Sequence, residues 1–256
     1  MGLSSSLHSL IDSSLDQNAG WLYASYKDKN IFLLIIFGNI LTCYKLYFMD
    51  SKYAESILIG LTGGIASGKS TVIHYLLEKG YSVINADKLG HRVLDQGTSG
   101  FKKVVETFGK GILFPNGSVN RKELGRIVFS NPKNLLKLNQ ISHPLIAEMI
   151  EIEYQKLFFI SKNKIIFLEA ALLIEAGWNE VCGEIWVIAQ KPDITMERLQ
   201  NRDGLSKVDA VARIESQISQ EERLTYADVV LKNDGLKEEL LAQTYEELLK
   251  LKKRIN

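Results

Sequence analysis

Short and nearly continuous apolar runs recur along the chain after residue 56. They occupy residues 57–62, 82–86, 165–169, 185–189 and 229–231. A run that is apolar at consecutive positions, and not only at alternate ones, is typical of a strand whose two faces are both buried. We therefore expect five strands in the interior of one sheet.

Between these runs the apolar positions follow helical spacing, most clearly over residues 131–159 and 236–254. The second of these segments ends in several lysines and an arginine, which suit the carboxyl end of a helix. Strands that alternate with helices along the chain form parallel sheets, because each crossover must return to the same edge. The pattern predicts an α/β fold with a parallel, doubly wound sheet.

The first 50 residues have a different character, because they contain neither Arg nor Glu, whereas the rest of the chain uses all four charged types. This shift predicts an extension over 1–55 and a main domain over 56–256. Residues 31–49 are apolar apart from Asn39 and Lys45, and they just reach the roughly 20 residues that a bilayer span needs. The pattern leaves open a membrane-associated segment and a packed hydrophobic extension.

Gly2 and Ser6 match the pattern for N-myristoylation, although only two positions of that pattern are informative. A myristoyl chain anchors weakly alone and would gain from a second apolar signal such as 31–49. The first 30 residues lack a cationic start and contain no Arg, which disfavours a signal peptide and a mitochondrial presequence. We expect a cytoplasmic protein and leave open its association with the cytoplasmic face of a membrane.

Composition excludes several classes of partner. The chain has 256 residues, of which 46% are hydrophobic and 24% charged, as in ordinary globular proteins. Its 31 basic and 30 acidic residues provide no basic field for a nucleic acid. Cys43 and Cys182 lie far apart and lack partners at zinc-site spacing. Any charged ligand must therefore be bound by a local site.

Such a site is predicted by residues 63–70, which read GGIASGKS and match G-x-x-x-x-G-K-[ST] directly after the first strand. Glycines let successive backbone N–H groups converge on a phosphate, and the following helix adds its N-terminus. Lys69 would bridge β- and γ-phosphate oxygens while Ser70 would ligate Mg²⁺. The predicted ATP-binding loop comprises Gly63, Gly64, Ile65, Ala66, Ser67, Gly68, Lys69, Ser70 and Thr71.

The class of enzyme depends on residues outside the loop. A GTPase would read guanine with Asn-Lys-x-Asp, and the nearest match, at 206–209, lacks the Asn. A kinase needs a carboxylate at the end of the next strand, and Asp87 lies there, where it could take a proton from an acceptor hydroxyl. An Asp after a strand is also a common helix N-cap, so both interpretations of Asp87 stay open.

Taken together, these motifs resemble those of the dephospho-CoA kinase family. The likeness runs from about residue 57 to 235 and includes LTGGIASGKST at 61–71 and HPLI at 143–146. Residues 85–87 match the family's Asp-Ala-Asp motif with Asn85 at its first position, 202–203 its lid Arg-Asp, and 233–235 its late Asn-Asn-Gly turn. Residues 169–178 look closest to the kinase half of the fused eukaryotic CoA synthase. The roughly 55 upstream residues are too few for that protein's other half, which favours a monofunctional kinase.

The resemblance implies a three-layer P-loop nucleotide-kinase-like fold with an inserted helical acceptor-binding domain and a helical lid at about 202–222. It implies that Asp87 is the general base and that Asn233 lies near the adenine of ATP. Arg198 and Arg202 share a face of a predicted helix, and the lid motif favours Arg202 as the cation on the transferring phosphoryl group. Glu169 would orient Mg²⁺ through water, unless it is only a surface carboxylate.

Arg121 and His143 fall in the helical region that binds the acceptor in this family. Either could contact the phosphates of dephospho-CoA, although a His before a Pro is as often a structural cap. The reaction implied is phosphorylation of the ribose 3′-hydroxyl of dephospho-CoA by ATP with Mg²⁺, the last step of CoA biosynthesis. The alternatives are another small-molecule P-loop kinase, acting on a nucleoside or nucleotide, and a membrane-tethered ATP-binding protein without turnover.

Overall fold

The computed structural model describes residues 22–27, 30–35, 57–160, 164–204 and 206–255, with only the backbone described for the first two ranges and for Phe159, Arg202 and Asp203. It separates into two units, Met1–Ala54 and Glu55–Asn256. In the first unit, strand β1 (Leu22–Lys27) pairs antiparallel with β2 (Asn30–Ile35). The apolar segment predicted over 31–49 thus begins inside a strand, while residues 36–49 and Gly2 lie outside the described residues. No helix among the described residues is long and apolar enough to cross a membrane.

The second unit is built on a five-stranded sheet with the order β4-β5-β3-β6-β7, in which all neighbours pair in parallel. Its strands are β3 (Ile57–Gly63), β4 (Ser82–Asn85), β5 (Ile165–Glu169), β6 (Glu184–Ala189) and β7 (Val229–Lys232). Residues 58–63 of β3 and all of β5 are buried. The predicted parallel sheet of five strands is confirmed, and β4 ends one residue earlier than expected.

Helices α3 (Lys69–Glu78) and α11 (Lys237–Ile255) pack against one face of this sheet. Alternate residues of β3 reach them, because Ile59 and Leu61 belong to a core cluster with Val72 and Leu76 of α3. In the same cluster the rings of Phe167 and Trp186 meet edge to face, with centroids 5.5 Å apart. The central strands are therefore anchored by aromatic and aliphatic packing on the α3–α11 side.

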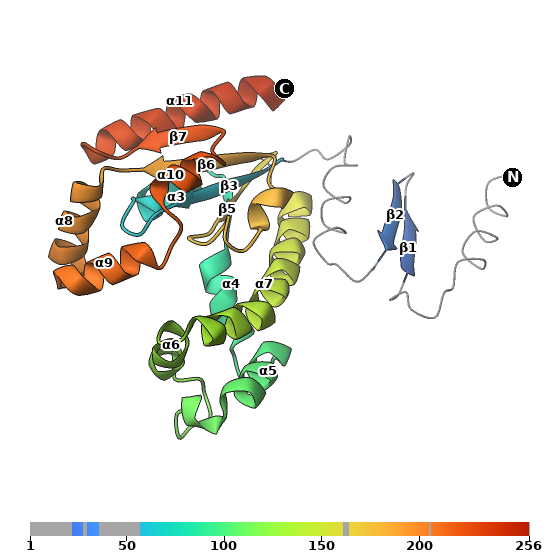
Figure 1. Ribbon diagram of the computed structural model, residues 1–256. Helices are drawn as coiled ribbons and strands as arrows, with labels where there is room; N and C mark the ends of the chain where they lie inside the picture. Colours follow the sequence, from blue (N-terminus) through green and yellow to red (C-terminus); the bar gives the residue numbers. More distant parts are fainter. Residues whose placement is uncertain (1–21, 28–29, 36–56, 161–163, 205, 256) are drawn as a thin grey trace, which may run out of the picture. The chain divides into compact units, whose positions relative to one another are not determined.

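The opposite face carries the helical insertion that the sequence predicted between the second and third strands. It consists of α4 (Ala86–Val93), α5 (Ser99–Phe108), α6 (Arg121–Phe129) and the long α7 (Pro132–Ile160). Figure 1 shows this region across the sheet from α11. Its outer part has a core of its own, made of Val104, Ile112, Val119, Leu124 and Val128.

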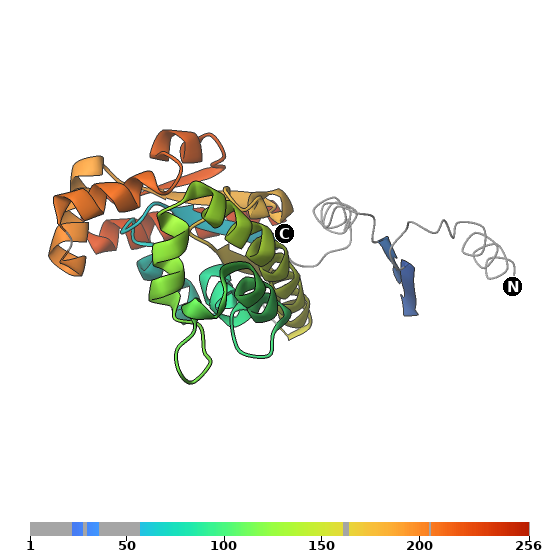
Figure 2. The same cartoon turned by 60° about the horizontal axis from the view of Figure 1, so that its bottom comes forward.

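The last helices before β7 are α8 (Pro192–Asp203), α9 (Lys207–Glu215) and α10 (Gln220–Leu224). Helix α8 ends before Gly204, whose φ of 63° is left-handed and therefore favours glycine. Figure 2 shows α8 and α9 side by side, and the two helices are in contact. The predicted lid at 202–222 corresponds to the end of α8, α9 and the start of α10; its role as a lid stays a prediction.

The close packing at Gly100, between α4 and α5, can be tested by a substitution. A Cβ on Gly100 would stand 2.5 Å from the Val93 carbonyl oxygen and 3.1 Å from Leu145 Cδ1 of α7. Because a backbone atom cannot yield cheaply, we expect Gly100→Ala to destabilise the protein by about 1–3 kcal/mol despite alanine's better helix propensity. Urea unfolding measures this change. Gly111→Ala is the matched control, since nothing lies within 4 Å of its Cβ position, and equal stability of the two variants would contradict the prediction.

Candidate active site

The loop between β3 and α3 takes a conformation that its glycines permit. A Cβ on Gly63 would stand 2.6 Å from both the Ile188 carbonyl oxygen and Ser67 Oγ. Gly68, with φ of 100°, is the N-cap of α3, and Ala66 also has a positive φ, of 58°. The loop therefore curls tightly over the end of β3, as successive N–H groups must do to face one phosphate.

Side chains from distant segments hold this loop. Asn233 Nδ2, just after β7, donates to the Ser67 carbonyl at 2.7 Å. The Ile65 N–H donates to Gln217 Oε1 at 3.0 Å. Lys69 Nζ donates to the carbonyls of Gly63 and Gly64 at 2.7 and 3.1 Å. Asn233 thus supports the loop, and its place near the adenine stays a prediction. Gln217 lies between α9 and α10 and was missed, because no sequence signal marks it.

Glu169 and Asn85 end the neighbouring strands β5 and β4 and face each other in register. Asn85 Nδ2 donates to Glu169 Oε2, and Glu169 is buried. Burial raises the pKa of Glu169, as does the nearby carboxylate of Asp87, whereas Lys69 and Lys88 lower it. Asp87 and Lys69 thus lie near Glu169 at the carboxyl edge of the sheet, and Glu169 is 6% exposed. The alternative of Glu169 as a mere surface carboxylate is therefore wrong.

Asp87 is not a helix N-cap. Helix α4 begins at Ala86, and its N-cap is Asn85, whose Oδ1 accepts from the Lys88 N–H at 2.7 Å. The N-cap alternative is wrong because the sequence pattern extended the strand to residue 86, whereas β4 ends at Asn85. Asp87 is exposed in the first turn of α4, where the helix N-terminus stabilises a negative charge. Its carboxylate is left available for an acceptor.

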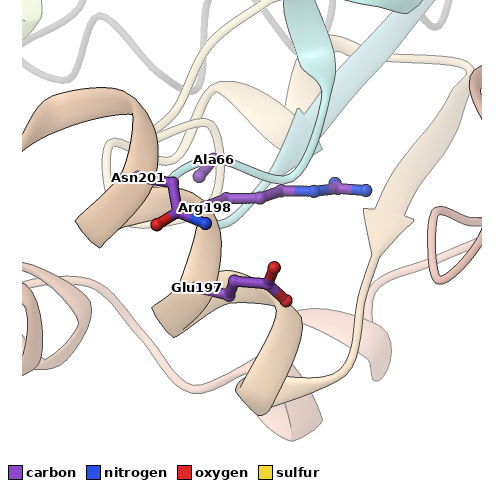
Figure 3. Close-up of a pocket in the computed structure, with 4 residues that line it drawn as sticks. All are labelled: Ala66, Glu197, Arg198 and Asn201. Atoms are coloured by element: carbon purple, nitrogen blue, oxygen red, sulfur yellow. The ribbon is translucent and has the colours of Figure 1, made fainter.

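Helix α8 borders the loop on another side. A pocket of about 320 Å³ is lined by Ala66 of the loop and by Glu197, Arg198 and Asn201 of α8, as Figure 3 shows. Arg198 donates to Gln190 Oε1 at 2.6 Å and to the Asn233 carbonyl at 3.2 Å. The sequence favoured Arg202 over Arg198. Arg202 lies in the last turn of α8, but its side chain is outside the described structure, so its role stays a prediction.

The two predicted acceptor contacts lie on different helices of the insertion. His143 lies inside α7 and is not a cap; its ring meets Trp178 with centroids 5.7 Å apart. Burial lowers the pKa of His143, and Glu175 opposes that shift. Arg121, at the start of α6, donates to the His91 carbonyl at 2.8 Å and lies 3.8 Å from Asp95. The described contacts do not bring His143 and Arg121 together.

The residues at this edge fit a metal that arrives with a nucleotide. Mg²⁺ usually keeps several waters and takes one or two carboxylates besides the substrate's phosphates. Glu169 supplies one buried carboxylate beside the loop, and Ser70 presents an exposed hydroxyl at the start of α3. Among the described residues no three His, Cys, Asp or Glu side chains cluster as a metal site.

Comparison with known proteins decides the family. The family model for dephospho-CoA kinase matches residues 57–239, from the start of β3 into α11. The chain is 43% identical over 188 residues to the dephospho-CoA kinase of Dehalococcoides mccartyi, covering 72% of this chain and 91% of that one. This chain belongs to the dephospho-CoA kinase family.

Solved structures agree with that assignment. A crystal structure from Thermus thermophilus matches at 31% identity with a TM-score of 0.66, covering 76% of this chain and 97% of its own. The dephospho-CoA kinase from Campylobacter jejuni matches at 32% identity with a TM-score of 0.59, covering 77% and 97%. The dephospho-CoA kinase family match includes the phosphate loop, Asp87, Glu169 and Asn233, while residues before 57 lie outside it.

The raised pKa of Glu169 predicts how stability depends on pH. A raised pKa in the folded state means that the folded protein holds this proton more tightly than the unfolded chain does. The stabilisation of the folded state that this proton provides is complete below the ordinary glutamate pKa of about 4. It is lost as the pH rises through the pKa of Glu169 in the folded state. Glutamine carries no such proton and keeps an oxygen for Asn85. We therefore expect Glu169→Gln to gain stability relative to wild type as the pH rises from about 4 to 8.

Urea unfolding of both proteins across that pH range measures this difference. Glu106→Gln, which changes an exposed carboxylate of α5, is the control and should follow wild type. A stability difference between Glu169→Gln and wild type that does not change with pH would refute the assigned shift.

Proposed function

We propose that this protein transfers the γ-phosphoryl group of ATP to the ribose 3′-hydroxyl of dephospho-CoA, giving CoA and ADP. One observation carries the proposal: a phosphate loop and two carboxylates meet at the carboxyl edge of the sheet, within the region matched by the dephospho-CoA kinase family. In open parallel sheets this edge is where ligands bind.

Each step of the transfer has a candidate group in this chain. Backbone N–H groups of the loop and the N-terminus of α3 bind the β-phosphate, and Lys69 neutralises charge on the β- and γ-oxygens. Asp87 accepts the proton of the 3′-hydroxyl as that oxygen bonds to the γ-phosphorus and the bond to the β-phosphate oxygen breaks. Arg202 provides further positive charge as α8 and α9 close over the nucleotide. Because the transfer involves little other covalent chemistry, positioning and charge neutralisation supply the catalysis.

Mg²⁺ bound with ATP would be held by Ser70 Oγ and, through water, by Glu169. The metal would screen charge on the phosphates. Glu169 has a second role that needs no metal, because it accepts from Asn85 and so links the ends of β4 and β5. Asn85 thereby fixes the first turn of α4, which carries Asp87.

Acceptor binding is assigned to the helical insertion, with Arg121 and His143 as the candidate contacts for the phosphates of dephospho-CoA. Arg121 is partly exposed and already oriented by the His91 carbonyl. We keep the prediction of a cytoplasmic enzyme, with membrane association through 31–49 or Gly2 as an additional property. Residues 31–35 would have to contribute to it as part of strand β2, not as a helix.

The test of the activity is ADP release, followed by a coupled assay, with dephospho-CoA, nucleosides and nucleotides offered as separate acceptors. We expect ADP formation that depends on dephospho-CoA, and a product phosphorylated at the ribose 3′ position. Turnover with a nucleoside or nucleotide instead would favour the other small-molecule kinases. ATP binding with no acceptor-dependent ADP would favour a binding protein without turnover.

A substitution at Asp87 tests the proposed base. Asn has nearly the same shape but cannot accept the proton, so Asp87→Asn should lower kcat about 100-fold or more while ATP affinity stays near wild type. Its melting temperature should change little, because the N-cap is Asn85. Steady-state kinetics and thermal unfolding measure both effects, with Glu106→Gln as the control. A wild-type kcat would remove Asp87 from the mechanism.

A further inference from the structure

Arg223, on the short helix α10, is a buried cation whose charge is incompletely compensated. The residue is only 2% exposed. Its Nε and Nη2 atoms have no hydrogen-bond partner among the described residues. The nearest carboxylate oxygen belongs to Glu175 and lies 3.6 Å from Nη2, beyond the usual range of a charge-assisted hydrogen bond. Burial lowers the pKa of Arg223, and Glu175 and Glu222 only oppose that shift.

Glu175 is not a dedicated partner for this arginine. Its Oε1 also accepts from the Ile218 N–H at 3.2 Å, and its Oε2 is buried without a hydrogen-bond partner. A buried ion pair stabilises a protein only when good geometry and further hydrogen bonds offset the cost of desolvation. The Glu175–Arg223 pair meets neither condition. A contribution to stability therefore does not explain why this charged pair is buried.

The position of the guanidinium indicates a role in ligand binding. Arg223 Nη1 lies 3.6 Å from the Cβ position of Gly64, the second residue of the phosphate loop. Because Gly64 has no side chain, nothing of that residue separates the guanidinium from the loop backbone. Helix α10 is held in this place at its first residue, since the Gln190 N–H donates to Gln220 Oε1 at 3.0 Å. Gln217, just before α10, binds the Ile65 N–H of the same loop.

Through its partner Glu175, Arg223 is also linked to the helical insertion. Its partner Glu175 acts electrostatically on His143 of α7, the helix that carries an acceptor candidate. Lys69 begins α3, but its ammonium reaches the same part of the loop, since Nζ donates to the Gly63 and Gly64 carbonyls. The group that travels between the nucleotide and the acceptor is the γ-phosphoryl group. The negative charge of this group would complete the compensation of the Arg223 cation, which Glu175 leaves incomplete.

We propose that Arg223 binds the γ-phosphate of the nucleotide during phosphoryl transfer, with Glu175 as the positioning residue that holds its guanidinium. The proposal rests on the proposed function, because it takes ATP as the ligand of the loop. In it, Nη1, the guanidinium nitrogen that faces Gly64, donates to γ-phosphate oxygens, while Nη2 keeps Glu175 as its partner. Planar, forked donors suit such shared contacts to phosphate oxygens.

The test compares the affinities of two nucleotides that differ at the γ-position, Mg²⁺–AMP-PNP and Mg²⁺–ADP, measured by calorimetry. The key variant is the double substitution Arg223→Met with Glu175→Gln. It removes both charges of the pair and keeps a side-chain oxygen for the Ile218 N–H, so it should retain a melting temperature near wild type. Arg223→Met alone would leave a buried carboxylate unpaired and should melt earlier.

In the double variant we expect AMP-PNP affinity to fall about tenfold or more, the usual scale for a lost hydrogen bond to a charged group, while ADP affinity changes less than twofold. The kcat should fall about 100-fold, as for loss of an electrostatic stabiliser. Arg254→Met is the matched control, because Arg254 also pairs with a glutamate, Glu184, but at the amino end of β6. It should keep both affinities.

Equal losses for AMP-PNP and ADP would overturn the proposal, because they would show that Arg223 only shapes the loop. Wild-type affinities and kcat in the double variant would overturn it too, since the pair would then be structural alone. If the double variant fails to fold, Arg223→Lys with Glu175 intact gives the same comparison, because lysine cannot reproduce the forked contact of the guanidinium. These affinities need no acceptor, so a failure of wild-type turnover with dephospho-CoA would count against the proposed function and leave this test intact.

Discussion

The site depends on one constraint: the backbone between β3 and α3 must keep a curled conformation that it would not hold by itself. Ala66 has a left-handed φ, which costs a residue with a Cβ about 1 kcal/mol or more. Contacts from far along the chain oppose that cost, since the hydrogen bond of Ile65 to Gln217 spans 152 residues and that of Asn233 to Ser67 spans 166. The loop is thus preorganised by the segments that follow β6 and β7. A change in those segments is therefore a change in the phosphate site.

The same architecture concentrates charge at the carboxyl edge of the sheet. Parallel pairing brings the ends of β4 and β5 into register, so that Asn85 stands opposite Glu169. An Asp at position 85 would have placed a second carboxylate against a glutamate whose pKa is already raised. Asn85 instead donates to Glu169 and caps α4 at the same time. The departure from the family's Asp-Ala-Asp motif therefore has a local compensation in hydrogen bonding.

Two regions near the carboxyl edge of the sheet are stabilised in different ways. The outer part of the helical insertion has its own apolar core of buried valines, leucine and isoleucine, so it can keep its shape as a unit. Segment 217–223 instead has few apolar anchors and is held by polar contacts, through Gln217, Gln220 and the Glu175–Arg223 pair. Polar tethers can exchange partners when a charged ligand binds. That property suits a segment that follows α9 and contacts the phosphate loop through Gln217.

The sequence by itself determined the parallel sheet and the phosphate loop, from local apolar periodicity and from glycine and lysine at fixed spacing, and it implied the inserted helical domain through its resemblance to the family. It also placed Asp87 and Glu169 at strand ends, since parallel strands share one carboxyl edge. The alternative that Asp87 caps helix α4 was wrong by one residue, because strand ends depend on ladder partners. The sequence pattern named Arg198 but favoured Arg202, and it gave no sign of Gln217 or Arg223. Only the tertiary structure decided the roles of Arg198, Gln217 and Arg223, because their contacts join segments that are distant along the chain. Burial and contacts across such distances leave no periodic signal in the sequence.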